Sequence, residues 1–138
     1  MKNARRIISL MLVLILCLTF ATAASAASNS KSAGIYGRVN GSSSQNKTNL
    51  VTGTSITQNP DNARLKVKII LTNTSSTVAT PSKRSAAGAT SLPYTYVIQY
   101  MYENEPTLAT CEHIVSDGIN DAEYSCYTST SLDTSYFN

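Results

Sequence analysis

Hydrophobic and polar residues alternate along the segment from residue 64 to residue 72. One side carries only aliphatic residues, and the other carries Lys66 and Lys68. The aliphatic set is Leu65, Val67, Ile69 and Leu71. A period of two predicts a β-strand with one buried and one solvent-facing side. A helix fits poorly, because these four residues would be spread around its circumference.

The same reasoning predicts further strands over residues 34–39, 50–57, 94–102, 108–116 and 122–130. Residues 40–49 are predicted to form a polar loop, and residues 73–91 a long Ser-, Thr- and Ala-rich connection with a short strand near 77–80. About six strands without helical periodicity indicate an all-β protein, a small antiparallel β-sandwich or barrel.

The N-terminal segment has the order of a secretory signal. Three basic residues are followed by an apolar run from Ile7 to Phe20 and by small residues that end with Ala24-Ser25-Ala26. This order predicts a cleavable signal peptide over residues 1–26, removed after Ala26. A membrane anchor fits less well, because the run has about 14 residues and a spanning helix needs roughly 20. We therefore expect a secreted protein, with retention at the cell surface as the alternative, and the style of the signal indicates a bacterial source. We expect a flexible start over residues 27–33 and one β domain over residues 34–138.

Removing the signal changes the charge balance. Three of the eleven Lys and Arg residues lie in it, so eight face eight Asp and Glu in the remainder. A near-neutral chain lacks the basic footprint of a nucleic-acid binder. The remaining charges are divided, with net +7 over residues 31–90 and net −7 over residues 91–138. We expect basic and acidic strands to intermix in one domain, since opposite charges on neighbouring strands attract. A dipolar surface is the alternative.

Two cysteines remain after cleavage, Cys111 and Cys126. Export implies an oxidising setting, so we expect them to form a disulfide across the last hairpin. If they are directly opposed, paired residue numbers add up to 237, and Gly118-Ile119 become the central residues of a type II′ turn. A five-residue loop from Asp117 to Asp121 with a bulge is the alternative.

The hairpin tip carries polar residues whose main interpretation is a solvated turn. A weak calcium candidate is formed by Asp117, Asn120, Asp121 and Glu123, although the spacing of an EF-hand loop is absent. A catalytic role for His113 finds little support, because the adjacent Glu112 would point to the opposite face of the strand. We therefore expect no enzyme activity, no catalytic residue and no cofactor.

Two surfaces are candidates for binding. Aromatic side chains could offer contact area to a sugar or a peptide, although the same tyrosines could simply form the core. This candidate surface comprises Tyr94, Tyr96, Tyr100, Tyr102, His113 and Tyr124. A candidate contact for an anion comprises Lys66, Lys68, Lys83 and Arg84.

The sequence as a whole favours a small secreted binding or interaction module. Its partner would be an extracellular protein or a cell-wall polymer. The alternative hypothesis is a bacteriocin-like antagonistic protein that acts on the envelope of a target cell. Motifs typical of nucleotide binding, zinc binding or hydrolysis were not found in the chain.

Overall fold

The computed structural model describes residues 26–98, 105–116 and 123–137 of the chain. Strands make up most of this part, and helices are limited to two short 3₁₀ turns. The elements are β1 (Ala26–Ser32), η1 (Gly34–Tyr36), β2 (Arg38–Asn46), β3 (Asn49–Ile56), β4 (Arg64–Thr72), β5 (Thr77–Ala79), β6 (Ser82–Arg84), β7 (Ser91–Val97), β8 (Leu108–Ser116), β9 (Glu123–Ser131) and η2 (Thr134–Tyr136). The prediction of an all-β protein is confirmed. The expected signal peptide lies almost entirely outside the described residues and stays a prediction.

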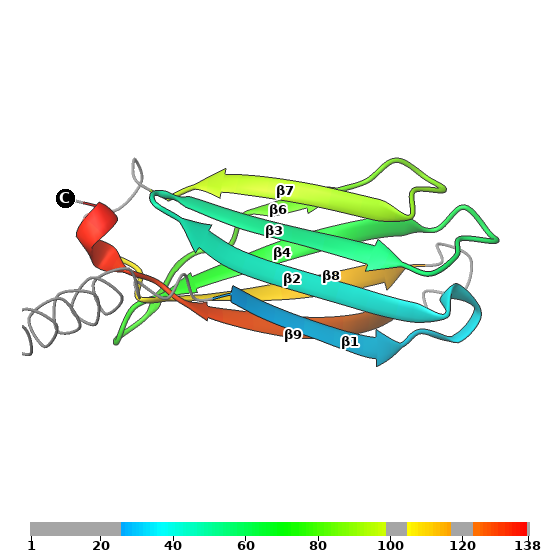
Figure 1. Cartoon of the computed structure of the whole chain (residues 1–138), viewed down its shortest axis with the longest axis horizontal. Coiled ribbons are helices and arrows are strands. Elements are labelled where there is room, and N and C mark those ends of the chain that lie inside the picture. The colour runs from blue at the N-terminus through cyan, green and yellow to red at the C-terminus, as the bar shows by residue number, and fades with distance from the viewer. Residues whose placement is uncertain (1–25, 99–104, 117–122, 138) are drawn as a thin grey trace, which may run out of the picture.

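The strands form two antiparallel sheets that lie one above the other (Figure 1). Sheet A has the order β1-β2-β3-β7. Sheet B has the order β5-β4-β8-β9, and β6 also pairs with β4. The described strands do not close into a barrel. Buried side chains from both sheets form one cluster between them, so the arrangement is sandwich-like.

Strand β4 supplies the most apolar part of this core. Its predicted bounds are those of the structure, and its four alternating aliphatic residues have no exposed surface. Burying each such side chain stabilises the fold by about 1.5–3 kcal/mol. The outward residues Lys66 and Lys68 are half-buried in the surface of sheet B.

Two expectations for the polar N-terminal region differ from the structure. The expected flexible start is strand β1, which pairs with β2 along its whole length. The expected polar loop over residues 40–49 is instead most of strand β2 and the turn that follows it. Strands β2 and β3 form a hairpin and pair as far as Asn46 and Asn49. Lys47 begins the tight turn between them with a positive φ of 54°. Strands β1 and β2 carry few apolar residues on either face, so alternation of hydrophobicity did not reveal them.

The expected disulfide between Cys111 and Cys126 is contradicted. Both cysteines are free and buried, and they are not within disulfide distance. The pairing of β8 with β9 explains this, because Cys111 lies opposite Thr128 and Cys126 opposite His113. Paired residue numbers therefore add up to 239 instead of 237, and the cysteines are diagonal neighbours. Such neighbours are about 7–8 Å apart, too far for the 3.5–4.5 Å between Cβ atoms that a disulfide requires. The turn expected at Gly118-Ile119 lies outside the described residues.

Side chains bridge the two sheets at both of their borders. On one border, Asn29 of β1 donates a hydrogen bond to the carbonyl oxygen of Tyr127 in β9 (2.8 Å), and these two strands lie side by side (Figure 1). On the other border, the Lys83 ammonium donates to the carbonyl oxygen of Pro93 (3.0 Å) and lies 5.7 Å from the centre of the Tyr94 ring. Proline suits the terminal strand of a sheet, because it has no N–H group for a further partner.

Candidate functional site

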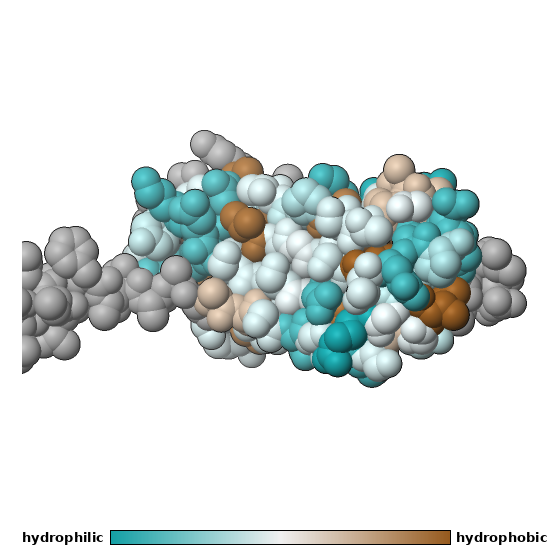
Figure 2. All heavy atoms as spheres, turned by 45° about the vertical axis from the view of Figure 1, so that its right-hand side comes forward, coloured by the Kyte–Doolittle hydropathy of each residue, from teal (hydrophilic) through white to brown (hydrophobic). Residues whose placement is uncertain are grey.

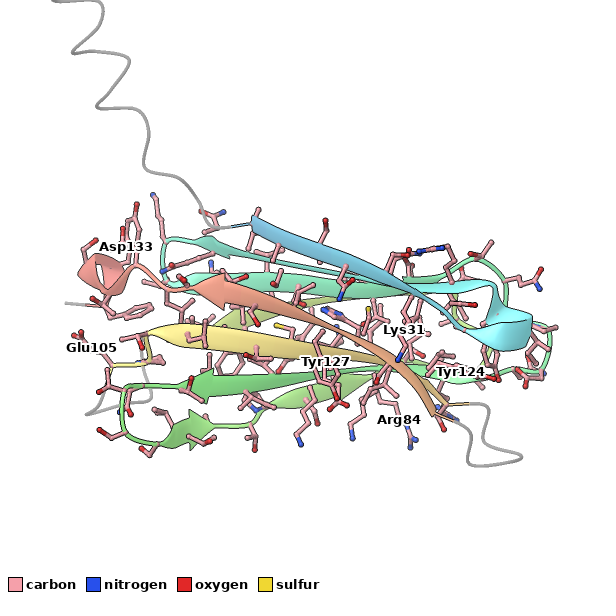
Figure 3. All side chains as sticks on the ribbon, turned by 90° about the horizontal axis from the view of Figure 1, so that it is seen from below. Lys31, Arg84, Glu105, Tyr124, Tyr127 and Asp133 are labelled. Carbon is pink, nitrogen blue, oxygen red and sulfur yellow. The ribbon has the colours of Figure 1, made fainter. Side chains whose placement is uncertain are left out.

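The residues of the expected aromatic surface that the structure describes do not gather on the outside of the molecule. Tyr94 and Tyr96 are half-buried, pack against the core and contact each other edge to face, with ring centres 6.3 Å apart. Tyr124 packs in a similar way against the buried Tyr36, at 6.0 Å. The labelled Tyr124 and Tyr127 both come from β9, near Lys31 of β1 (Figure 3). Tyr100 and Tyr102 lie outside the described residues.

His113 lies inside the molecule and has no exposed surface. Its Nδ1 atom is 3.0 Å from Thr54 Oγ1 in sheet A, and its Nε2 atom is 2.8 Å from Thr128 Oγ1 in β9. A neutral imidazole has one N–H donor and one acceptor nitrogen, so one threonine accepts from the ring and the other donates to it. Burial lowers the pKa of His113 to about 4. The ring is therefore neutral at pH 7, and it links the two sheets.

Gly41 of β2 explains how the imidazole fits between the sheets. A Cβ atom placed on Gly41 would overlap with the ring of His113. The glycine therefore leaves the room that the ring occupies, and β2 passes directly over it.

Other polar side chains form a buried cluster beside His113. Ser43 of β2 and Thr130 of β9 share a hydrogen bond of 2.6 Å across the two sheets. Burial raises the pKa of the Cys111 thiol, although contacts with Thr52, Thr128 and Ser43 oppose this shift. Burial also raises the pKa of Cys126. Thiols of this kind stay protonated and are weak nucleophiles, so the cluster has a structural role.

The outer face of sheet A carries a groove of about 770 Å³. Most of its lining comes from outward-facing residues of all four strands, arranged in two rows by the pairing of the strands. One row is Ser28, Ser42, Gly53 and Pro93, and the other is Ser30, Asn40, Ser55 and Ser91. Strands lie about 4.7–4.9 Å apart, so a groove that crosses four of them is roughly 14 Å long.

The groove is hollow because the side chains along it are small. Gly53 lies near its middle, between Ser42 and Pro93 in the row. A Cβ atom on Gly53 would make only ordinary contacts, the nearest at 3.6 Å. Its φ angle also lies outside the left-handed region, so the backbone does not require glycine. The fold would therefore tolerate a side chain at position 53, and its absence makes the groove deeper.

The polar side chains that line the groove carry hydroxyl or amide groups, while the larger part of its exposed surface is apolar. Ser30 donates a hydrogen bond to Asn40 Oδ1 (2.6 Å), and the Arg38 guanidinium donates to Ser30 Oγ (2.8 Å). None of the side chains that line the groove carries a charge. The space-filling view shows a surface that is mostly pale, the colour of residues of intermediate hydropathy, with strongly polar and apolar residues in small separate areas (Figure 2).

The residues proposed to contact an anion separate into two groups. Lys66 of β4 lies directly opposite Arg84 of β6, with Lys68 two residues further along β4. Lys83 belongs to the opposite side of β6 and bridges to Pro93. On the other side of β4, Lys68 lies opposite Glu112 of β8, so a basic and an acidic strand are neighbours.

The calcium candidate at the hairpin tip lies outside the described residues, except for the backbone of Glu123 in β9. Among the residues that the structure describes, no group of three or more His, Cys, Asp or Glu side chains is suited to hold a metal ion. Over the same residues, no helix has the length and apolar character needed to span a membrane.

Comparison of the chain with models of protein families, with curated proteins and with solved structures finds no match. Function therefore has to be inferred from the residues of the chain itself. The groove could not be found from the sequence, because its rows form only when β7 pairs with β3. The alternating small residues of β2 were the only local signal.

Proposed function

We propose that this protein is a secreted binding module that holds a neutral, hydroxyl-rich ligand, an oligosaccharide or polysaccharide, in the groove of sheet A. The observation that carries this proposal is the pair of in-register rows of small, uncharged residues across all four strands, of which all but Gly53 and Pro93 carry a hydroxyl or an amide group. The protein acts by binding, outside the cell or at its surface.

The lining chemistry favours a sugar over a peptide. Backbone groups in the middle of a sheet are already used by the hydrogen bonds between strands, so a peptide cannot add there as a further strand. Side-chain hydroxyls and amides remain, and each can donate as well as accept. A ligand with many closely spaced hydroxyl groups can form hydrogen bonds with most of these side chains at once.

The size of the side chains also favours this assignment. Serine loses little conformational entropy when it is fixed, compared with the long side chains of Lys, Arg or Gln. The hydrogen bond between Ser30 and Asn40 orders part of one row before any ligand arrives. Each hydrogen bond contributes about 0.5–1.5 kcal/mol, so we expect weak binding with a Kd of roughly 0.1–1 mM.

The test is a comparison of two valine variants. Gly53→Val fills the middle of the groove, and Thr95→Val changes an exposed residue of the same sheet that does not line the groove. The mature protein is titrated with neutral cello-, chito-, malto- and manno-oligosaccharides by isothermal calorimetry. We expect one of these series to bind the wild type and Thr95→Val, and to lose at least about tenfold in affinity for Gly53→Val.

Stability measurements separate a filled groove from a damaged fold. Valine has a higher strand propensity than glycine, and glycine within a strand is unfavourable by roughly 0.5–1 kcal/mol. Gly53→Val should therefore unfold at an equal or higher urea concentration than the wild type. No binding of any of the four series to the wild type, or equal binding to both variants, would refute the proposal.

A further inference from the structure

The outer face of sheet B, opposite to the groove, carries a strip of positive charge. Arg64, Lys66 and Lys68 project outward from β4, because they alternate with its buried aliphatic residues. Successive outward residues on a strand are about 6.4–6.8 Å apart. Arg84 adds a fourth charge from β6, opposite Lys66. These four residues are called the basic strip below.

The pairing of Lys66 with Arg84 is unfavourable for the fold. Like charges directly opposite each other on neighbouring strands destabilise a sheet. The neighbour of Lys66 on its other side is Ile114 of β8, which is buried and offers no charge. The two cations are therefore held side by side without a facing carboxylate in their own row.

The two outer cations of the basic strip on β4 each have a polar neighbour. Arg64 donates a hydrogen bond to the carbonyl oxygen of Ser85 (3.1 Å), which positions it close to Arg84. The acid nearest in register is Glu112, opposite Lys68. One of its oxygens accepts a hydrogen bond from the hydroxyl of Tyr127 (2.7 Å), a residue of β9, which lies on the side of β8 away from β4. In Figure 3, Arg84 lies near the lower rim of the view, on the opposite side of the molecule from β1.

We propose that the basic strip is a second binding site, which takes a linear polymer with repeating phosphate groups. A phosphate has several oxygens and can accept from Lys66 and Arg84 at the same time. The further charges of Arg64 and Lys68 continue the strip along β4, so a chain with repeating anions contacts more of it than a single anion does. The site is independent of the groove. It lies on the other sheet, and its side chains are positively charged, whereas those that line the groove are uncharged.

A protein with both sites can hold two different polymers at once. The groove of sheet A and the basic strip face away from each other, with the buried core between them. Binding of a phosphate polymer therefore leaves the groove open. This property extends the proposed function from simple binding to bridging.

The experiment uses long-chain inorganic polyphosphate and charge-matched variants of the mature protein. The double variant Lys66→Gln/Arg84→Gln removes two charges from the basic strip. The control Lys31→Gln/Lys47→Gln removes two charges from β1 and from the turn after β2. Fluorescence anisotropy at low salt should show at least about a tenfold loss of affinity for the strip variant and less than about threefold for the control.

Three outcomes would overturn the proposal. One is an equal loss of affinity for both double variants, which would mean that only net charge matters. Another is equal binding of polyphosphate and poly-glutamate by the wild type, which would remove the preference for phosphate. The third is binding of vesicles with anionic lipid but not of polyphosphate, which would identify a membrane surface instead.

Unfolding in urea without ligand gives an independent readout. Because Lys66 and Arg84 repel each other, Lys66→Gln should raise the unfolding midpoint or leave it unchanged, while it weakens polyphosphate binding. A lowered midpoint would show that Lys66 supports the fold and would contradict the role proposed here. Failure of this site would leave the oligosaccharide titrations with Gly53→Val unaffected.

Discussion

The buried imidazole of His113 makes a sharp prediction about the effect of acid on stability. Its pKa in the folded protein is about 4, and that of a histidine in an unfolded chain is about 6.5. Between these values the unfolded chain binds a proton that the folded chain does not bind. Stability contributed by the neutral ring is therefore complete above pH 6.5 and is lost as the pH falls towards 4.

The size of this loss follows from the two pKa values. The penalty is about 0.2 kcal/mol at pH 7, roughly 2 kcal/mol at pH 5, and about 3 kcal/mol once the pH is below 4. A protonated ring would also have two donors, and one of its two threonine partners would have to stop donating to it. With urea, a change of about 2 kcal/mol moves the unfolding midpoint by roughly 1–2 M.

The assay is urea unfolding of the protein without residues 1–26 at pH 7, 6, 5 and 4.5, compared with the variant His113→Gln. Carboxylates titrate in both proteins, so the difference between their pH profiles isolates the histidine. The wild type should lose about 2 kcal/mol more than the variant between pH 7 and pH 5. A nuclear magnetic resonance titration of the folded wild type, which needs no variant, should show no ring protonation above pH 5. Parallel pH profiles together with a ring pKa near 6.5 would refute the reasoning.

Two further predictions concern residues around the same ring. Gly41→Ala forces the ring of His113 to move and should reduce the free energy of unfolding by about 2–4 kcal/mol, through the loss of two buried hydrogen bonds; an unchanged urea midpoint would contradict the packing of β2 on the ring. Cys111 and Cys126 should not react with a thiol reagent in the native protein, and both should react after denaturation without reductant. Zero thiols in the denatured protein would show that the disulfide forms after all.

Strands with an apolar face could be predicted from the sequence. The bounds of β4 and β8 were correct, because Leu65, Val67 and their neighbours alternate clearly. Strands β1 and β2 were missed for a physical reason. Their inward positions include Gly41 and Ser43, which pack against polar groups of sheet B instead of an apolar core. Period-two alternation of hydrophobicity cannot reveal a strand that is buried against hydroxyl groups.

The register of the last hairpin could not be predicted from the sequence either. Shifting β9 by two residues keeps every side chain on the same face, so the hydrophobic pattern fits both registers equally well. The assumed disulfide selected the register that opposes Cys111 and Cys126. The structure has the other one, which places Thr128 within reach of His113 and opposite Cys111. The contact between Thr128 and His113, which lies within sheet B, belongs to the observed register and has no signal in the hydrophobic pattern.

The candidate sites depend on pairings between distant parts of the chain. The groove requires β7 beside β3, although three strands lie between them in sequence. The basic strip was predicted in part, since Lys66, Lys68 and Arg84 were named from the charge pattern. Lys83 lies apart from these three residues, because its position in β6 turns it towards Pro93. A strand as short as β6 has too few residues for alternation to predict which side of the sheet each side chain lies on.

The most direct test of the central claim is to map where a sugar binds. ¹H–¹⁵N spectra of the labelled protein without residues 1–26 are recorded during titration with the oligosaccharide that binds best in calorimetry. The amide signals of Ser42, Gly53 and Ser55 should shift together and saturate, while those of β4 and β8 in sheet B stay in place. Saturating shifts confined to sheet B, or no saturable shift anywhere, would contradict a sugar-binding groove on sheet A.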